Sequence, residues 1–380
     1  MEKSKSKFNK TVLLRADAND AIGMGHMMRC ISVARAMLRD GNDKITPVFV
    51  ISDERSAGLL AERELEFVCL HTDYRDKIPE VEDGVDSPMG QLFRNYHPVS
   101  MLVDSYQVEA SYFTGLRRIA EAVAALDGMA RTGIFYLDDV DVPDYELDGI
   151  INYNIYAGDL PYRQEKRFLG SAYIPLGEKF WDVKKRINNS TPEGDEIRNS
   201  DNSLHCMISS GGADMLNICY TIGERMASAY PDCVFHVVCG KYNAHRSELL
   251  RLAEQHTNLC VEYDVRDMCA LEQNCDIAIS AAGSTMYELA VLGVPTITYF
   301  FADNQRLVAE AFAGQTGMCN AGDYRVDSQT VLERIQQRFE EYKDNTLIRM
   351  NAGRRIRHVT DGLGAFRIAG ILTGMEQTNL

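Results

Sequence analysis

Short apolar runs alternate with amphipathic stretches along most of the chain, and this alternation predicts the fold class. In the first half, six runs have the length and composition of buried strands, at residues 12–17, 46–52, 67–70, 100–106, 133–138 and 149–154. The stretches 26–39 and 109–126 between them are amphipathic, and apolar residues of the first recur at steps of four, three and four, the period of one helical face. Strands that alternate with helices in this way predict a parallel, doubly wound α/β sheet.

A polar segment separates this half from a second one of the same kind. Residues 185–203 contain Pro192 and Gly194 and have no periodicity, which indicates a linker or a surface insertion. Further strands are predicted at 204–209, 233–239, 259–263, 276–281 and 294–301, with helices at 215–230, 244–256, 284–292 and 304–314. We therefore predict an N-terminal α/β domain at 1–185, a linker or insertion at 186–203, and a C-terminal α/β domain with a helical tail at 204–380. Ligands of such sheets bind outside the carboxyl ends of the strands, so we expect a cleft between the halves.

Composition and charge narrow the class of protein. The chain has 380 residues, of which 45% are hydrophobic and 25% charged, so disordered, collagen-like and coiled-coil classes are excluded. Its net charge of −15 argues against nucleic acid as a partner, because phosphate contact needs clustered basic residues. No stretch reaches the ~18 apolar residues of a membrane-spanning helix, and the polar N-terminus lacks the apolar core of a signal peptide, so we expect a cytoplasmic location. The ten cysteines form no C-x-x-C pair, which favours buried reduced thiols over a disulfide framework or a zinc site.

The first motif that could carry chemistry joins the first predicted strand to the first predicted helix, at residues 15–29 (RADANDAIGMGHMMR). Gly23 and Gly25 allow a tight turn, and His26 falls in the first helical turn, where the positive end of the helix dipole disfavours imidazolium. A neutral imidazole can act as a general base. The alternative is a capping or packing histidine after a glycine turn. The full G-x-G-x-x-G pattern is absent because residue 28 is Met, which disfavours a dinucleotide site.

Two further glycine turns follow predicted strands in the second half. Gly211 and Gly212, in SSGGADMLN, would let backbone amides approach an anion, although an ordinary strand–helix turn explains them equally well. In SAAGSTMYE, Ser284 and Thr285 can donate to phosphate oxygens at a helix N-terminus. Glu288, one turn later, can accept from both hydroxyls of a ribose. The alternative is that Ser284 caps the helix and that Glu288 is an ordinary first-turn acid.

Polar residues at the ends of other predicted strands are lesser candidates. Asn304, in FADNQ, could bind a sugar or a phosphate, but helix capping explains it equally well. Asp104 and Tyr106, in DSY, and the pair Asp138 and Asp139 end strands in the first half and are expected to line the cleft. Paired aspartates can hold Mg²⁺, but we favour a solvated turn for this pair.

The motifs as a set resemble one family over about residues 11–320. The motifs of this chain occur in the order and approximate spacing of that family: RADANDAIGMGHMMR, DSY, LDD, NYN, SSGGADMLN, SAAGSTMYELAVLGVP and ADNQ. The chain resembles the UDP-2,4-diacetamido-2,4,6-trideoxy-β-L-altropyranose hydrolases of pseudaminic acid biosynthesis and the related spore-coat polysaccharide proteins. The resemblance implies two Rossmann-like domains of the glycosyltransferase-B type and hydrolysis of a UDP-sugar, without metal or cofactor, to UDP and free sugar for nonulosonic acid biosynthesis and surface glycan modification. We expect a monomer or a weak dimer.

The resemblance also implies roles for individual residues. His26 matches the catalytic histidine of the family, Asn304 its asparagine before glutamine, and Tyr106 its tyrosine after the aspartate that ends a strand. We expect catalytic roles for His26, Asn304, Tyr106 and Asp17, and contacts with the UDP-sugar from Gly23, Gly25, Arg29, Gly211, Gly212, Ala282, Gly283, Ser284, Thr285, Glu288 and Gln305. Two alternatives stay open, a glycosyltransferase of the same fold and a non-catalytic protein that binds a nucleotide sugar.

Overall fold

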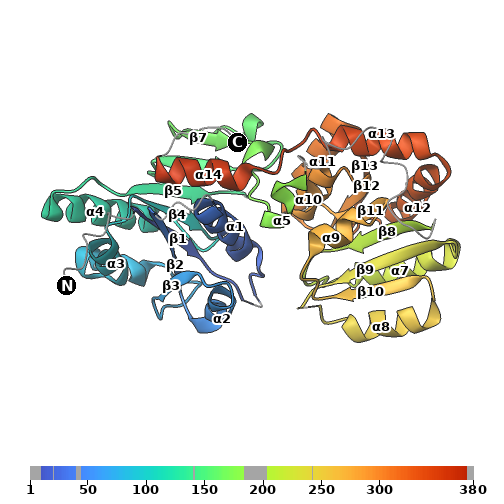
Figure 1. Cartoon of the computed structure of the whole chain (residues 1–380), viewed down its shortest axis with the longest axis horizontal. Coiled ribbons are helices and arrows are strands. Elements are labelled where there is room, and N and C mark those ends of the chain that lie inside the picture. Colours follow the sequence, from blue (N-terminus) through green and yellow to red (C-terminus); the bar gives the residue numbers. More distant parts are fainter. Residues whose placement is uncertain are drawn as a thin grey trace, which may run out of the picture. The chain divides into compact units, whose positions relative to one another are not determined.

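The computed structural model describes residues 10–19, 21–39, 44–139, 142–183, 203–241 and 243–374. The chain divides into two compact units: unit 1 is Met1–Glu178 with Leu363–Leu380, and unit 2 is Lys179–Gly362. Each unit has one parallel sheet with helices packed on it (Figure 1). The predicted linker at 186–203 lies, except for its last residue, outside the described residues.

The sheet of unit 1 has seven strands in the order β3-β2-β1-β4-β5-β6-β7. The strands are β1 (Lys10–Ala16), β2 (Ile45–Ile51), β3 (Glu66–Cys69), β4 (Ser100–Asp104), β5 (Gly133–Leu137), β6 (Gly149–Asn152) and β7 (Arg167–Leu169). The main helices are α1 (Gly25–Arg39), α2 (Ala57–Ala61), α3 (Pro88–Tyr96), α4 (Ala110–Asp127) and α14 (Gly364–Thr373). The direction of strand order reverses between β1 and β4, so the carboxyl ends of these two strands flank the place where ligands bind in doubly wound sheets.

Apolar side chains on both faces of this sheet hold unit 1 together. On one face, Phe93 of α3 and Phe113 of α4 pack with strand residues such as Val103 in a fully buried core. Helices α1 and α14 contact each other and cover the opposite face (Figure 1). Helix α4 ends at Gly128, whose φ of 64° is the left-handed conformation that favours glycine at a helix C-terminus.

The sheet of unit 2 has six strands in the order β10-β9-β8-β11-β12-β13. The strands are β8 (Leu204–Ser209), β9 (Cys233–Cys239), β10 (Leu259–Tyr263), β11 (Ile277–Ala281), β12 (Thr296–Phe300) and β13 (Cys319–Asp323). The helices are α7 (Ile218–Ala229), α8 (Arg246–Gln255), α9 (Met268–Gln273), α10 (Thr285–Leu292), α11 (Asp303–Thr316), α12 (Ser328–Asp344) and α13 (Thr346–Ile356), and the short α5 (Glu178–Trp181) contains the boundary between the units. Here the strand order reverses between β8 and β11, which places the loops after these strands at the ligand-binding edge.

The structure differs from the predicted organisation at short edge strands and at the C-terminus. Strands β7 and β13 are absent from the prediction, because β7 has three residues and β13 reads CNAGD, without an apolar run. Helix α14 belongs to unit 1, whereas we predicted one C-terminal domain at 204–380. Its last turn is bound to unit 1, because the hydroxyl of Ser100 donates to the carbonyl of Leu372 at 2.6 Å.

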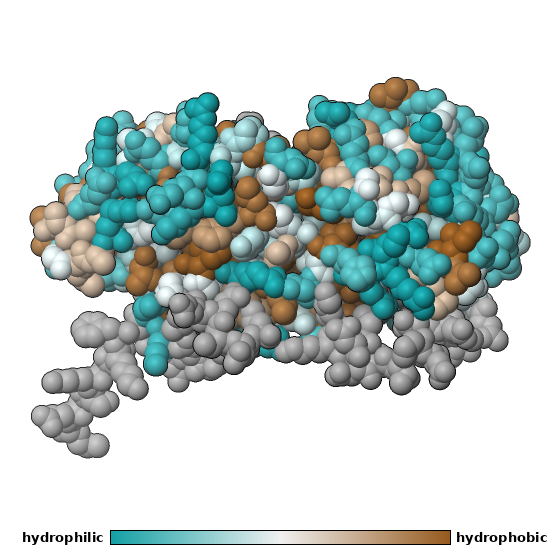
Figure 2. Space-filling view, turned by 90° about the horizontal axis from the view of Figure 1, so that it is seen from above, coloured by the Kyte–Doolittle hydropathy of each residue, from teal (hydrophilic) through white to brown (hydrophobic). Residues whose placement is uncertain are grey.

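The cysteines are mostly buried, and hydrophilic side chains are common on the surface. All ten cysteines are free, and seven of them are buried. Hydrophilic residues cover much of each unit on the face that Figure 2 shows, with smaller hydrophobic patches among them. Within the described ranges, no helix is both long enough and apolar enough to cross a membrane.

Candidate active site

The central feature of unit 1 is a contact between His26 and Asp104. Strands β1 and β4 are neighbours with Ala16 opposite Asp104, so the helix that follows β1 begins close to the last residue of β4. Gly23, with a φ of 73°, makes the turn before α1, and His26 is the second residue of that helix. As a result, Nδ1 of His26 lies 2.6 Å from Oδ1 of Asp104, and both residues are buried.

The charge state of Asp104 defines the tautomer of this histidine. Arg29 donates to both carboxylate oxygens of Asp104, from Nε and from Nη2, each at 2.7 Å. Burial on its own would raise the pKa of Asp104, but the charge of Arg29 and the hydrogen bonds from Arg29 and His26 outweigh it and lower this pKa to about 2. Asp104 is therefore a carboxylate, which can only accept, so the neutral tautomer of His26 that fits this contact carries its proton on Nδ1. The other ring nitrogen, Nε2, is then unprotonated and can take a proton from a substrate or from water.

Arg29 connects this pair to a second carboxylate. Its Nη1 donates to Asp139 at 2.5 Å and to the hydroxyl of Tyr153 at 2.6 Å. The hydroxyl of Tyr106 donates to the same Asp139 oxygen at 3.1 Å, and its ring meets His26 edge-on with ring centroids 4.3 Å apart. We predicted that Arg29 contacts substrate. Its guanidinium contacts protein groups and orients Asp104 and Asp139, and a contact with substrate stays a prediction.

A small pocket opens at these residues. It is lined by Asp17, Ile22, His26, Asp104, Ser105, Tyr106 and Gln107. Tyr106 is 47% exposed although its hydroxyl is bonded, so the phenol forms part of the pocket's accessible wall. Three of the four predicted catalytic residues, His26, Tyr106 and Asp17, thus lie around one pocket.

Asp17 is surrounded by buried cations. It accepts from Arg15 at 2.9 Å, from Lys77 at 2.7 Å and from the backbone N–H of Ser52 at 2.7 Å. Burial would raise the pKa of Asp17, but Arg15 and Lys77 lower it to about 2. Arg15 is in turn paired with the fully buried Glu80 at 2.7 Å. A carboxylate with so many donors is a poor proton acceptor, so this network supports the pocket floor. Sequence reasoning missed Lys77 and Glu80, which follow a loop without a strand or helix pattern.

The paired aspartates at the end of β5 are not a solvated turn, and that prediction is wrong. Asp138 is 1% exposed and accepts a hydrogen bond from the hydroxyl of Tyr162. Asn152 donates to the same hydroxyl at 2.7 Å, and Asp139 is the partner of Arg29 described above. Protein donors from three segments therefore hold both carboxylates.

In unit 2, the turn after β8 is open at its glycines but closed at the helix that follows. A side chain at Gly211 or Gly212 would meet no atom within 4 Å, and Gly211 has a φ of 81°. The carboxylate of Asp214, however, accepts from the N–H groups of Ile218 and Cys219 at 2.9 and 3.1 Å. These first-turn donors of α7 are therefore occupied, and an anion at this turn would have to rely on the glycine backbone.

The turn after β11 is different, because the helix that follows is not capped by a side chain. Ser284 is the N-cap residue of α10 and is exposed, and its hydroxyl makes no capping hydrogen bond. A side chain at Gly283 would meet no atom within 4 Å. Ala282, just before it, is buried. The capping alternative for Ser284 is therefore not observed, and the helix start has the open, donor-rich character of an anion site.

Glu288 lies one turn into α10, and its charge acts on a second acid, Glu272, that the sequence reasoning missed. Burial raises the pKa of Glu288 to about 7, although a hydrogen bond from Thr285 opposes the shift. Glu272 of α9 is fully buried, and neither of its carboxylate oxygens has a hydrogen-bond partner in the described part of the chain. Burial, followed by the charge of Glu288, raises the pKa of Glu272 well above its ordinary value. Burial therefore favours the protonated, uncharged form of Glu272. Glu272 lies three residues after the buried Cys269 on α9, and this helical spacing could have indicated that both side chains face the core.

The last two predicted residues follow β12. Gln305 is fixed, because its side-chain oxygen accepts from the N–H of Phe301 at 3.1 Å. Asn304 is exposed in the first turn of α11, and the N-cap of this helix is Ala302. Capping therefore does not explain Asn304, and its amide is accessible for a ligand.

Comparisons with known proteins give distant relatives. No protein-family model matches the chain. An uncharacterized protein of Methanocaldococcus jannaschii is 22% identical over 300 residues, which is 78% of this chain and 56% of that protein. The spore coat polysaccharide biosynthesis protein SpsG of Bacillus subtilis is 23% identical over 178 residues, 46% of this chain and 51% of the relative. The pseudaminic acid cytidylyltransferase and UDP-2,4-diacetamido-2,4,6-trideoxy-β-L-altropyranose hydrolase of Helicobacter pylori is 21% identical over 212 residues, 56% of this chain and 36% of that protein. The chain thus matches about a third to just over half of the length of these relatives.

Solved structures establish the fold. MurG of Acinetobacter baumannii has a TM-score of 0.59 and 14% identity, over 96% of this chain and 100% of that one. The UDP-GlcNAc 2-epimerase of Neisseria meningitidis, solved with UDP-GlcNAc, has a TM-score of 0.61 and 14% identity over 96% and 100% of the two chains. Two Rossmann-like units and these likenesses confirm the predicted fold class, which is the glycosyltransferase-B type.

Proposed function

We propose that this protein is an enzyme of nucleotide-sugar metabolism that hydrolyses a UDP-linked 2,4-diacetamido-2,4,6-trideoxyhexose to UDP and the free sugar. The observation that carries the proposal is the His26–Asp104 pair, which engages Nδ1 of a histidine that lines a pocket of unit 1 and makes Nε2 the candidate proton acceptor. The named activity of the Helicobacter pylori relative supports this choice of substrate. A role in making a pseudaminic-type sugar in the cytoplasm is part of the same proposal.

The reaction needs one base and a stabilised leaving group. Nε2 of His26 takes a proton from a water molecule, whose oxygen attacks the anomeric carbon of the sugar. The bond between that carbon and the β-phosphate oxygen breaks, and UDP leaves with the electron pair. Asp104 stabilises the imidazolium that forms, as the carboxylate of a catalytic triad does. A single displacement of this kind inverts the anomeric carbon. Because UDP is a good leaving group, no metal is required in this scheme.

Unit 2 would supply the nucleotide-binding groups. The uncapped start of α10, with Gly283, Ser284 and Thr285, has the donors that a diphosphate needs. Glu288 stands one turn further, and its carboxylate can accept from the two ribose hydroxyls. The open backbone at Gly211 and the exposed amide of Asn304 are further donors for the phosphates or the sugar.

A glycosyltransferase is the second candidate, and the fold favours it. The same base would then deprotonate an acceptor hydroxyl in place of water. Tyr106 is exposed, so the pocket is open to solvent on this side.

Incubation of the protein with the UDP-linked diacetamido sugar and no acceptor separates these functions. A hydrolase releases UDP and free sugar in equal amounts, with one oxygen from labelled water at the anomeric carbon. A glycosyltransferase releases UDP at a comparable rate only after an acceptor is added. A protein that binds the nucleotide sugar and never turns it over would contradict both enzymatic functions.

A further inference from the structure

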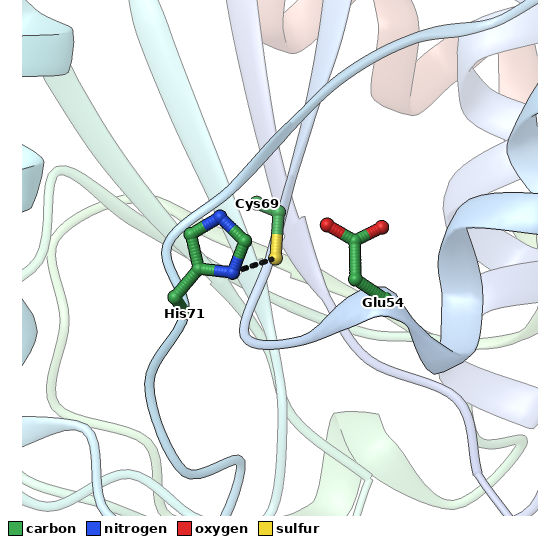
Figure 3. A group of neighbouring side chains, drawn as sticks. All are labelled: Glu54, Cys69 and His71. Carbon is green, nitrogen blue, oxygen red and sulfur yellow. Dashed lines mark hydrogen bonds between the residues drawn. The ribbon is translucent and has the colours of Figure 1, made fainter.

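Unit 1 carries a second group of chemically capable side chains that the proposed reaction does not use. Strands β2 and β3 are parallel neighbours, with Ile51 opposite Cys69. Glu54 lies in the short 3₁₀ helix Glu54–Ser56 that follows β2, Cys69 ends β3, and His71 comes two residues later. Because both strands leave the sheet at the same edge, the three side chains meet there (Figure 3).

The three side chains offer one oxygen, one sulfur and one nitrogen within a small volume. One ligand atom of each lies within 4.8 Å of the others, and no other group of this kind occurs in the part of the chain that the structure describes. Nδ1 of His71 lies 3.5 Å from Sγ of Cys69. In Figure 3 the sulfur lies between the imidazole and the carboxylate. Glu54 and His71 are exposed and Cys69 is half-buried, so an ion could reach them from solvent.

From this arrangement we infer that Glu54, Cys69 and His71 bind one divalent cation of the zinc class. A thiolate and an imidazole together select zinc or a similar transition metal over Mg²⁺ and Ca²⁺, which prefer oxygen ligands. Bonds of about 2.0–2.3 Å in a tetrahedron place neighbouring ligand atoms about 3.3–3.8 Å apart. The sulfur–nitrogen separation already falls in this range, so small side-chain rotations complete the site. Three protein ligands leave the fourth position for water or for a ligand atom from outside.

The backbone and the local charge favour this use of the three residues. His71 has a φ of 55°, in the left-handed region that residues other than glycine rarely adopt. In this conformation its imidazole lies beside the thiol of Cys69. Asp53 adds a second carboxylate beside Glu54, although it is paired with Arg55 at 2.6 Å. A cation here would bind the end of β3 to the segment after β2.

Such a cation would act on the stability of unit 1. Sγ of Cys69 lies 3.6 Å from the carbonyl of Ser52, and the hydroxyl of Ser52 contacts Asp17 at 3.0 Å and Lys77 at 2.9 Å. The site is therefore joined through one residue to the charged network under the His26 pocket. A cation that binds only the folded state stabilises it by mass action.

The first test measures zinc binding directly on the full chain, without an affinity tag and stripped of metal. Titration with Zn²⁺ should give one site per chain in the wild type and in Cys260→Ser, which removes the exposed cysteine of β10 as a matched control. Cys69→Ser should weaken binding by more than the ~10–100-fold that loss of an outer-sphere partner costs. With Co²⁺, only proteins that retain Cys69 should show the absorption of a cobalt–thiolate bond. Equal affinity in Cys69→Ser and the wild type would overturn the inference.

A second test does not depend on a variant that folds. Alkylation of the wild-type protein, mapped residue by residue by mass spectrometry, should slow at Cys69 when Zn²⁺ is present and recover with a chelator, while Cys260 stays unchanged. Equal protection of both cysteines, or of neither, would contradict the site. The probe is the metal alone, so failure here leaves the proposed hydrolysis untouched, and loss of the proposed hydrolysis leaves the metal site untouched.

Discussion

His26 and Asp104, 78 residues apart in sequence, meet with Nδ1 and Oδ1 at 2.6 Å, and Arg29 holds the same carboxylate with two further hydrogen bonds. The contact orients the imidazole and fits the neutral tautomer with its proton on Nδ1, in which Nε2 is the proton acceptor. The two residues meet because His26 is in the first turn of the helix that follows β1, and Asp104 is the last residue of the neighbouring strand β4. The proposed mechanism depends on this arrangement more than on any other contact.

Replacing Asp104 by Asn should lower kcat without unfolding the protein. The amide can donate to Nδ1, which moves the histidine proton to Nε2 and removes the base; the comparable change in a serine-protease triad costs about 10⁴-fold. Steady-state release of UDP measures the effect, and calorimetry with UDP is the control, because unit 2 should bind the nucleotide as before. An Asn variant with wild-type turnover would remove Asp104 from the mechanism.

Glu288→Ala should weaken UDP binding by about 10–100-fold, since we expect a net loss of roughly 1.5–3 kcal/mol when hydrogen bonding to this charged group is removed. Glu288→Gln should lose less. The wild-type affinity should also rise as pH increases through about 7, the pKa of Glu288, because only the ionised carboxylate accepts from both ribose hydroxyls.

Calorimetry with UDP and 2′-deoxy-UDP across this pH range measures both effects. Titration of the UDP phosphates affects binding to the wild type and to the Gln variant equally, so the variant is the control for it. If wild-type protein binds the two nucleotides equally, Glu288 is a first-turn helix acid and not a ribose ligand.

Glu272→Met should stabilise the protein, by about 1–3 kcal/mol, because it removes a buried acid without hydrogen-bond partners. The folded protein keeps the Glu272 proton well above the ordinary pKa of 4.5, whereas the unfolded chain releases it. The stability cost of Glu272 therefore grows as pH rises above about 4.5. Chemical denaturation at pH 5 and pH 8 should show a larger gain at pH 8. Glu254→Met, at an exposed position of α8, is the matched control, and an equal gain in both variants would refute the explanation.

Removal of metal should leave turnover intact. His26 and the backbone donors perform the proposed reaction, and the inferred zinc-class site lies at other residues. EDTA treatment followed by a UDP-release assay should retain the starting activity, and added Zn²⁺ or Mg²⁺ should not raise it. Activity that disappears with EDTA and returns with Mg²⁺ would point to Asp138 and Asp139 instead.

Local sequence patterns predicted the alternation of strands and helices, and they placed His26 in the first turn of a helix after a glycine turn. They could not predict that β4 lies beside β1, because strand order depends on how distant segments pair, and the partner of His26 follows from that order. The network of charged residues around Asp17 could not be predicted either, because Lys77 and Glu80 come from a segment without a strand or helix pattern. Helix α14 follows α12 and α13 in the sequence, and only tertiary packing assigns it to unit 1.

The most direct test of the account is the turnover of His26→Ala with the UDP-linked diacetamido sugar. We expect kcat to fall by roughly 10²–10⁴-fold, the usual contribution of a general base, with UDP affinity unchanged. His358→Ala, which removes an exposed histidine of unit 2, should keep wild-type activity. A His26→Ala protein that retains more than about a third of wild-type turnover would contradict the assignment of His26 as the base.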